Sequence, residues 1–387
     1  MRFERYCFSN FTLIQLLRRL ALLLLLGFGV LLPSFGQNVT PPTSPLTDDE
    51  RALHVLNRLA YGPAPGDLEQ IRKSGVRAYI AAQLNPGSIP LPADLQAQLD
   101  SLNTYQLTPA QTFLQYGPPS FARNTASVEE INQSRQRAAR EITPQTHQAR
   151  IWQAVESPRQ LQEVMTEFWF NHFNVFEGKN WDRYWIADFE KSAIRPNALG
   201  NFRQLLGAVA HHPAMLFYLD NWLSSGVDTP EAKGQFKGLN ENYARELMEL
   251  HTLGVDGGYT QADVIAMARV LSGWTIDVKG MRQGQAGAAF LYNPRRHDSG
   301  AKVLLGQTLQ AANGQQEGER ALDLLAAHPS TAKFISTKLV EYFVSDQPDP
   351  VLVDQLARRF QSSNGDIKAV LQVLFDSPQF WSRKNYQ

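Results

Sequence analysis

The 387-residue sequence predicts an all-α protein, with one large bundle-like domain of many helices and at most one small β-hairpin. Apolar residues recur at helical spacings of three and four along most of the chain. Helix-capping patterns precede several of these stretches, as at Thr47 with Glu50. Strand signals are few, because only residues 302–305 and 308–310 favour a hairpin. These observations together favour helices packed on helices.

The first 36 residues are typical of a secretory signal peptide. Four arginines precede or flank the start of an apolar run of 13 residues, 20–32, which is too short for an ordinary membrane span but suits the core of a signal. Ser34 and Gly36 place small residues before a cut that leaves Gln37 as the new N-terminus. We therefore expect an exported protein, periplasmic or extracellular, without a membrane span after cleavage. A retained membrane anchor is the alternative.

Cleavage would change the charge and cysteine counts. The full chain has 37 Lys and Arg side chains against 37 Asp and Glu. Removal of four arginines, Glu4 and Cys7, the only cysteine, leaves 33 basic and 36 acidic side chains. This near-balance argues against a nucleic-acid-binding protein. A cysteine-free mature chain also excludes disulfides, thiol catalysis and thiolate metal sites.

The elements follow in order from a Pro-rich linker, residues 37–46, into a domain predicted over 47–382. The first helix starts at Thr47 and stops before Tyr61, and the next runs from Pro65 to about Leu84 with a pause at Gly75. Further helices are predicted at 157–172, 181–192, 201–211, 213–220, 240–253, 261–272, 318–327, 331–344, 350–361 and 366–375. Residues 125–142 are polar and are predicted to be a solvated helix or a mobile excursion. Two glycine-rich stretches, 224–238 and 279–300, are candidates for loops over a site.

The helix predicted at 240–253 carries an unusual set of polar residues. Asn242, Glu246 and Glu249 share one of its faces, and Arg245 can pair with acidic neighbours one turn away. One hypothesis makes Glu246 or Glu249 a general acid or base, or a metal ligand, oriented by Asn242 and Arg245. The alternative is a surface ladder of ion pairs with one core carboxylate.

Three histidines could complete such a site. His251 leans toward the apolar stripe of the same helix, about 140° from Glu246, so the two cannot chelate one ion from a regular helix. His172 is predicted to point inward among aromatic residues. His297 and Asp298 end the second glycine-rich stretch, where they either complete a site or tie down the loop. For His172 and His251 the alternative is a hydrogen-bonded core histidine.

Several segments resemble a known family. They are LNRLAYGP at 56–63, FWFNHF at 168–173, NENYARELMELHTLG at 240–254, YTQADV at 259–264, LSGW at 271–274, Arg296-His297, and HPSTAKF at 328–334. Together they are similar to the bacterial family called domain of unknown function 1800, from about residue 50 to 382. The resemblance implies an exported single-domain protein, and it suggests a partner, since members are often encoded beside an exported family similar to alkaline phosphatases and sulfatases. It implies no activity and no catalytic residues.

Two functions are compatible with these observations. The first is an exported hydrolase of envelope or extracellular polymers, with a divalent metal as a possible cofactor. The second is a non-catalytic envelope binding or assembly protein that works with the phosphatase-like or sulfatase-like partner. The residues predicted to form the site are Glu246, Glu249, His251, Arg245, Asn242, His172 and His297.

Overall fold

A computed structural model describes residues 44–118, 127–309 and 314–386 of the chain. The predicted signal peptide, and the linker up to residue 43, lie outside the described residues. The described residues all belong to one compact unit, 44–387.

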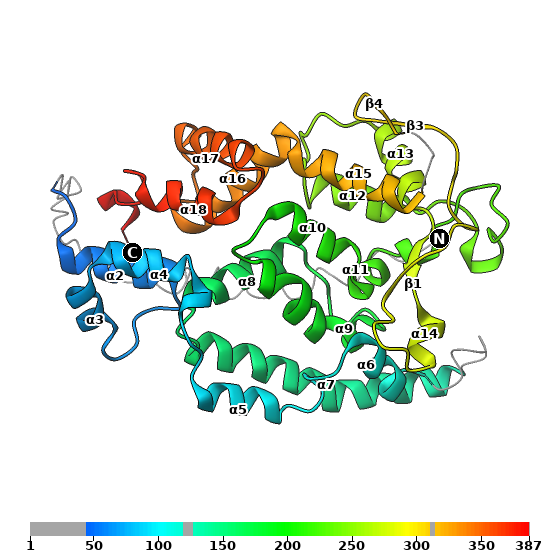
Figure 1. Cartoon of the computed structure of the whole chain (residues 1–387), viewed down its shortest axis with the longest axis horizontal. Helices are drawn as coiled ribbons and strands as arrows, with labels where there is room; N and C mark the ends of the chain where they lie inside the picture. Colours follow the sequence, from blue (N-terminus) through cyan, green and yellow to red (C-terminus); the bar gives the residue numbers. More distant parts are fainter. Residues whose placement is uncertain (1–43, 119–126, 310–313, 387) are drawn as a thin grey trace, which may run out of the picture. The chain divides into compact units, whose positions relative to one another are not determined.

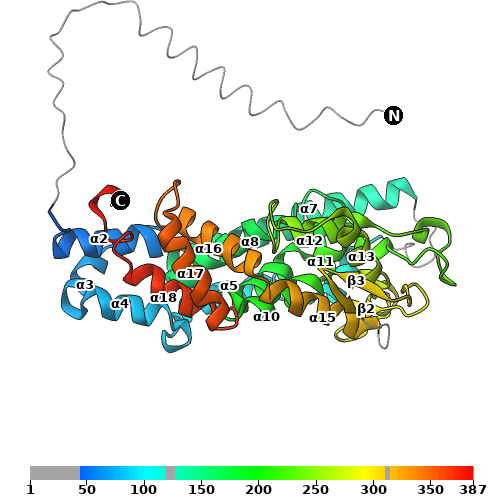
Figure 2. The same ribbon diagram turned by 90° about the horizontal axis from the view of Figure 1, so that it is seen from above.

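The prediction of an all-α fold is confirmed, since helices make up most of the described residues (Figures 1 and 2). The α-helices of the N-terminal half are α2 (Asp48–Leu59), α3 (Asp67–Ser74), α4 (Val76–Gln83), α5 (Ala93–Ser101), α6 (Pro109–Tyr116), α7 (Val128–Glu156), α8 (Gln160–His172), α9 (Asp182–Asp188), α10 (Phe202–Ala210) and α11 (Pro213–Tyr218). Those of the C-terminal half are α12 (Glu241–Glu249), α13 (Gln261–Leu271), α14 (Val278–Arg282), α15 (Gly314–Ala327), α16 (Pro329–Phe343), α17 (Pro350–Ser362) and α18 (Ile367–Asp376). A π-helical turn, η3 (Phe189–Ile194), continues α9, and short 3₁₀ turns are η1 (Pro86–Ser88), η4 (Arg195–Asn197), η5 (Asn221–Leu223), η6 (Gly234–Phe236) and η7 (Arg383–Asn385).

Four short strands form two antiparallel pairs within the described residues. The predicted hairpin is present as β3 (Lys302–Leu304) and β4 (Gln307–Leu309). A second pair joins β1 (Trp274–Ile276) to β2 (Phe290–Tyr292) across α14. All three residues of β1 are buried, so no polar and apolar alternation marks it in the sequence.

Local capping signals locate several helix starts correctly. The side chain of Thr47 accepts from the backbone N–H of Glu50, whose carboxylate accepts from the N–H of Thr47 in return. Asp366 caps α18 in a similar way. Residues 128–142 of the predicted polar stretch belong to α7, whose 29 residues make it the longest helix described, and residues 125 and 126 lie outside the described residues. α8 begins at Gln160, later than the start predicted at residue 157, because Arg159 has a non-helical backbone.

The end of α12 differs from the prediction, which continued the helix to residue 253. The backbone N–H groups of Leu250 and His251 both donate to the carbonyl of Glu246, at 2.9 and 3.0 Å. Gly254 then adopts a φ of 84°, a left-handed conformation that commonly closes a helix. Leu250, at the C-terminal cap of α12, is 47% exposed.

One continuous hydrophobic core connects nearly all the elements, and a smaller cluster lies where α5, α7 and α9 meet. α16, α17 and α18 pack in sequence on one another, and the residues after α18 return to α2 at the start of the unit (Figure 1). α7 packs against α5, α6, α8 and α9. The surface of α7 beside α8 carries the cavities described below.

Candidate functional site: an ionic cavity beside α7

Three open cavities follow the C-terminal half of α7 and the residues just after it. The central cavity, of about 280 Å³, shares Tyr61, Ile151 and Ala154 with a larger cavity of about 790 Å³. It shares Arg150 and Phe170 with a third cavity of about 250 Å³ on its other side. We call these three adjoining cavities the α7 groove.

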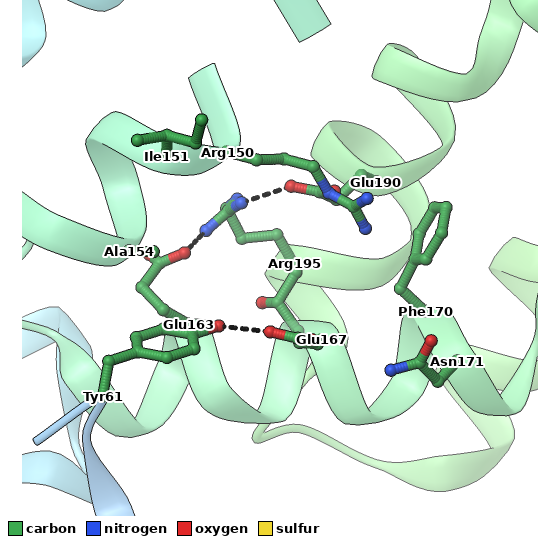
Figure 3. A pocket seen from close by; sticks show the side chains of 11 residues that line it. Tyr61, Arg150, Ile151, Ala154, Glu163, Glu167, Phe170, Asn171, Glu190 and Arg195 are labelled. Carbon is green, nitrogen blue, oxygen red and sulfur yellow. Dashed lines mark hydrogen bonds and ion pairs between the residues drawn. The ribbon is translucent and has the colours of Figure 1, made fainter. Parts of the chain in front are cut away.

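The centre of the groove contains an arginine between two carboxylates (Figure 3). Arg195 forms ion pairs with Glu163 of α8 and, at 2.6 Å, with Glu190 of η3. The side chains of Glu163 and Glu190 are only 7% and 4% exposed. Burial alone would lower the pKa of Arg195, but the two carboxylates raise it above its ordinary value. The guanidinium therefore stays charged in a nearly dry site.

The π-helical turn explains why Arg195 reaches Glu190. The backbone N–H of Arg195 donates to the carbonyl of Glu190, five residues earlier in the chain. A π-turn stacks residues five apart, whereas an α-helix stacks residues three or four apart. The π-turn thus brings the side chains of Glu190 and Arg195 together, whereas an α-helix would place two residues at this spacing on different faces.

A second arginine extends this network to the protein surface. Arg150 of α7 forms an ion pair with Glu190 through Nε, and its guanidinium lies over the ring of Phe170 with 4.0 Å to the ring centroid. Its side chain is 36% exposed. Stacking on an aromatic ring restricts the orientation of the guanidinium. Arg150 lines both the central cavity and the third cavity, so its guanidinium is available to a ligand there.

The opposite side of the central cavity carries a tyrosine and a carboxylate. The hydroxyl of Tyr61 donates to Glu167 at 2.7 Å, and half of the Tyr61 side chain is exposed. Burial of the hydroxyl and its bond to Glu167 both raise the pKa of Tyr61. Burial also raises the pKa of Glu163, although Arg195 opposes this shift. The lining of the central cavity thus combines aromatic, cationic and anionic groups.

The four polar residues predicted on α12 lie on its surface and make local contacts. Glu249 accepts from the hydroxyl of Tyr259 at 2.9 Å. Arg245 donates to the side chain of Gln261 at 2.7 Å. Asn242 is exposed, and burial together with the charge of Glu249 raises the pKa of half-buried Glu246.

His172 and His251 are brought together in the core. Nε2 of His172 donates to the backbone carbonyl of His251 at 3.0 Å, and the two ring centroids are 6.3 Å apart. Phe173 lies beside both rings. Burial lowers the pKa of each histidine to about 3, with the neighbouring imidazole adding to the shift of His172. Both rings are therefore neutral at physiological pH.

His297 belongs to a different buried network. Its Nδ1 lies 2.8 Å from the carbonyl of Ser272, and its Nε2 lies 3.1 Å from Glu317 of α15. Glu317 also accepts from the buried ammonium of Lys302 at 2.8 Å, and Lys302 donates to the carbonyl of Asp298. These contacts join the loop to α15 and β3. They do not connect His297 to His172 or His251.

A polar cluster that the sequence analysis missed lies at the N-terminal end of α12. Lys179 donates to both carboxylate oxygens of Asp220, at 3.0 and 3.1 Å, and the side-chain amide of Asn242 donates to the carbonyl of Leu219. Asp182, close to Lys179, is fully buried, and neither of its oxygens has a hydrogen-bond partner among the described residues. Burial raises the pKa of Asp182 to about 9. The only signal for this cluster in the sequence was Asp182, a charged residue at the start of the aromatic-rich helix α9.

In the part of the chain that the structure describes, no group of three or more His, Cys, Asp or Glu side chains is arranged to hold a metal ion. In the same residues, none of the helices is both long and apolar enough to cross a membrane.

The described residues thus form an all-α protein with an ionic cavity on its surface beside α7. Residues 54–387 match the family model described as "Protein of unknown function (DUF1800)", and the chain belongs to that family. This confirms the resemblance carried by the segments between residues 56 and 334. No curated protein and no solved structure matches the chain.

Proposed function

We propose that this protein binds a ligand in the α7 groove after export from the cell. One observation carries the proposal: three adjoining cavities share their lining residues, and a buried Glu–Arg–Glu network lies at their centre. Ligand sites commonly combine a concave surface of several hundred Å³ with a few fixed polar groups. The groove has both features.

Binding agrees better with the geometry than hydrolysis by the predicted residues. None of the seven predicted side chains lines the α7 groove. They make contacts in separate places, on α12, in the core beside Phe173, and beside Glu317. Within the groove, Arg195 pairs with the two most buried carboxylates, an arrangement that favours recognition over proton transfer.

The test is a thermal-shift screen of soluble envelope components and polymer fragments. A ligand of the groove raises the melting temperature of the native protein, and Arg150→Gln, which removes the half-exposed guanidinium, reduces that rise. Arg358→Gln removes an exposed arginine on α17 and serves as the matched control. Ligands that shift both variants equally would contradict binding in the groove.

A hydrolase remains the second candidate because of one specific observation. Burial and the neighbouring carboxylate of Glu249 raise the pKa of Glu246, which lies within electrostatic range of Tyr218. Carboxyl groups with raised pKa values are candidates for general acids. The test compares native protein with Glu246→Gln on a panel of hydrolase substrates, with and without a metal chelator. Equal activity of the two proteins would exclude Glu246 as the acid.

Export is part of the proposal and has its own test. Expression of the full chain in a bacterial host, followed by fractionation and mass analysis, is expected to give an exported chain that begins at Gln37. A full-length chain in the membrane fraction would instead favour the retained anchor. Co-purification with the phosphatase-like or sulfatase-like protein encoded nearby tests the assembly role.

A further inference from the structure

We infer that the α7 groove selects a basic peptide segment with apolar side chains, which makes a protein the partner of this chain. The inference rests on the proposed binding function and names the chemical class of the ligand. The charge of the groove, its apolar lining and its length each favour such a ligand.

The groove is strongly acidic. Its lining includes six carboxylates against two arginines: Asp67, Glu156, Glu163, Glu167, Glu177, Glu190, Arg150 and Arg195. Arg195 is already paired with two of these carboxylates, and Arg150 with one. Glu156 and Glu167 are exposed. A cationic ligand is therefore favoured in the groove, since charge complementarity speeds association and rejects partners of like charge.

The largest of the three cavities is mainly apolar. Ile151 and Val155, four residues apart on α7, are 61% and 73% exposed, and Tyr61 beside them is 50% exposed. Aliphatic side chains at this spacing form one continuous patch on a helix. Such a patch fits the aliphatic side chains of a peptide better than the hydroxyl-bearing edges of a sugar chain.

The length of the groove fits a short peptide segment. The cavities follow α7 from Thr146 to its end at Glu156. At about 1.5 Å per residue, this stretch of helix is roughly 15 Å long. An extended peptide advances by about 3.3 Å per residue, so roughly five residues would lie along it.

The experiment measures binding of short fluorescent peptides to the full protein by anisotropy. The first peptide contains lysine, leucine and serine; in the second, glutamate replaces lysine; in the third, serine replaces leucine. An oligomer of glucosamine is the fourth probe and represents a cationic sugar chain. We expect the first peptide to bind best and its affinity to fall as ionic strength rises.

Three variants test the place and the chemistry of binding. Glu156→Gln and Glu167→Gln are each expected to lower the affinity for the first peptide by about two- to fivefold, which is typical for exposed charge pairs. The double substitution of Ile151 and Val155 by Gln is expected to abolish the advantage of leucine over serine. Asp354→Asn removes one exposed carboxylate on α17 and is expected to leave binding unchanged. All five positions are exposed, so the variants are expected to fold.

Each contrary result has a defined meaning. Stronger binding of the acidic peptide, or of the glucosamine oligomer, would overturn the inference. Peptide binding that is insensitive to the groove variants would overturn it as well. If no peptide binds but another ligand binds the native protein and not Arg150→Gln, the inference fails while the proposed binding function stands.

Discussion

At the scale of single residues, Asp182 is the residue of the polar cluster beside α12 whose burial most destabilises the folded state at neutral pH. Its carboxyl is fully buried without a hydrogen-bond partner among the described residues, and its pKa is raised to about 9. The folded state therefore keeps a proton that the unfolded state loses above its ordinary pKa of 3.8. Because the folded state binds more protons, the contribution of Asp182 to stability falls as the pH rises from 3.8 to about 9.

The substitution Asp182→Asn is expected to stabilise the protein at neutral pH. The amide has the same shape and needs no buried proton, so we expect a gain of about 1–3 kcal/mol in the free energy of unfolding at pH 7. Urea unfolding at pH 7 and at pH 3.5 measures it. The gain should disappear at pH 3.5, where both states are protonated, and an equal gain at both pH values would contradict the explanation.

The histidine pair predicts loss of stability in mild acid. The pKa values of His172 and His251 are about 3 in the folded state, below the ordinary value of 6.5. The unfolded state therefore takes up protons below pH 6.5 that the folded state excludes. Each histidine is expected to remove up to about 1.4 kcal/mol per pH unit as the pH falls from 6.5 toward 3.

Urea unfolding between pH 7.5 and pH 5 checks this expectation. His172→Gln and His251→Gln should each reduce the slope of stability against pH by roughly one proton. His147 is an exposed histidine, and His147→Gln is the matched control for the loss of one imidazole. If all three variants keep the native slope, the buried pair is not its source.

At the scale of secondary-structure elements, Arg195 joins α8 to η3, and Arg150 adds α7 to the same network. Arg195→Met is expected to lower the free energy of unfolding by about 3–5 kcal/mol, because it leaves two buried carboxylates without their cation. Arg150→Met should cost about 1 kcal/mol, since its side chain is partly exposed and Glu190 keeps Arg195. Chemical denaturation of both variants measures the difference, and similar losses would contradict the central role of Arg195.

Local signals predicted most helices but not this network. The two residues of the capping pair Thr47 and Glu50 lie three positions apart in the chain, and the pair is present as predicted. Glu163 and Arg195 are 32 residues apart, and no local pattern connects them. The π-turn that positions Arg195 also departs from the helical spacing on which the predictions depend. One useful sign was Glu163 itself, a carboxylate among the apolar residues of α8.

At the scale of the whole molecule, the chain after α18 closes the structure onto α2. Phe380 is fully buried, and its carbonyl accepts from Nε2 of His54 at 2.9 Å. Arg58 donates to the carbonyl of Asn385 at 2.9 Å, and Arg383 pairs with Glu50 at 2.8 Å. Residues more than 300 positions apart thus meet at one surface.

A chain that ends at residue 376 is expected to lose at least about 3 kcal/mol of stability, because it loses the buried ring of Phe380. Thermal unfolding compares it with the full chain and with a chain that ends at residue 385. The longer truncation product keeps Phe380 and Arg383, so it should melt close to the full chain. Equal melting of all three would show that the closing segment is dispensable.

The sequence by itself determined the all-α class, most of the helices, the β3–β4 hairpin and membership of the family. These features depend on spacing and capping within a few residues, where the chain alone specifies the geometry. Only the tertiary structure decided which polar groups meet. It placed His297 beside Glu317, away from His172 and His251, and it assembled the α7 groove from segments between residues 61 and 195. Periodicity shows which face of a helix is buried, but the partner of that face depends on packing between distant segments.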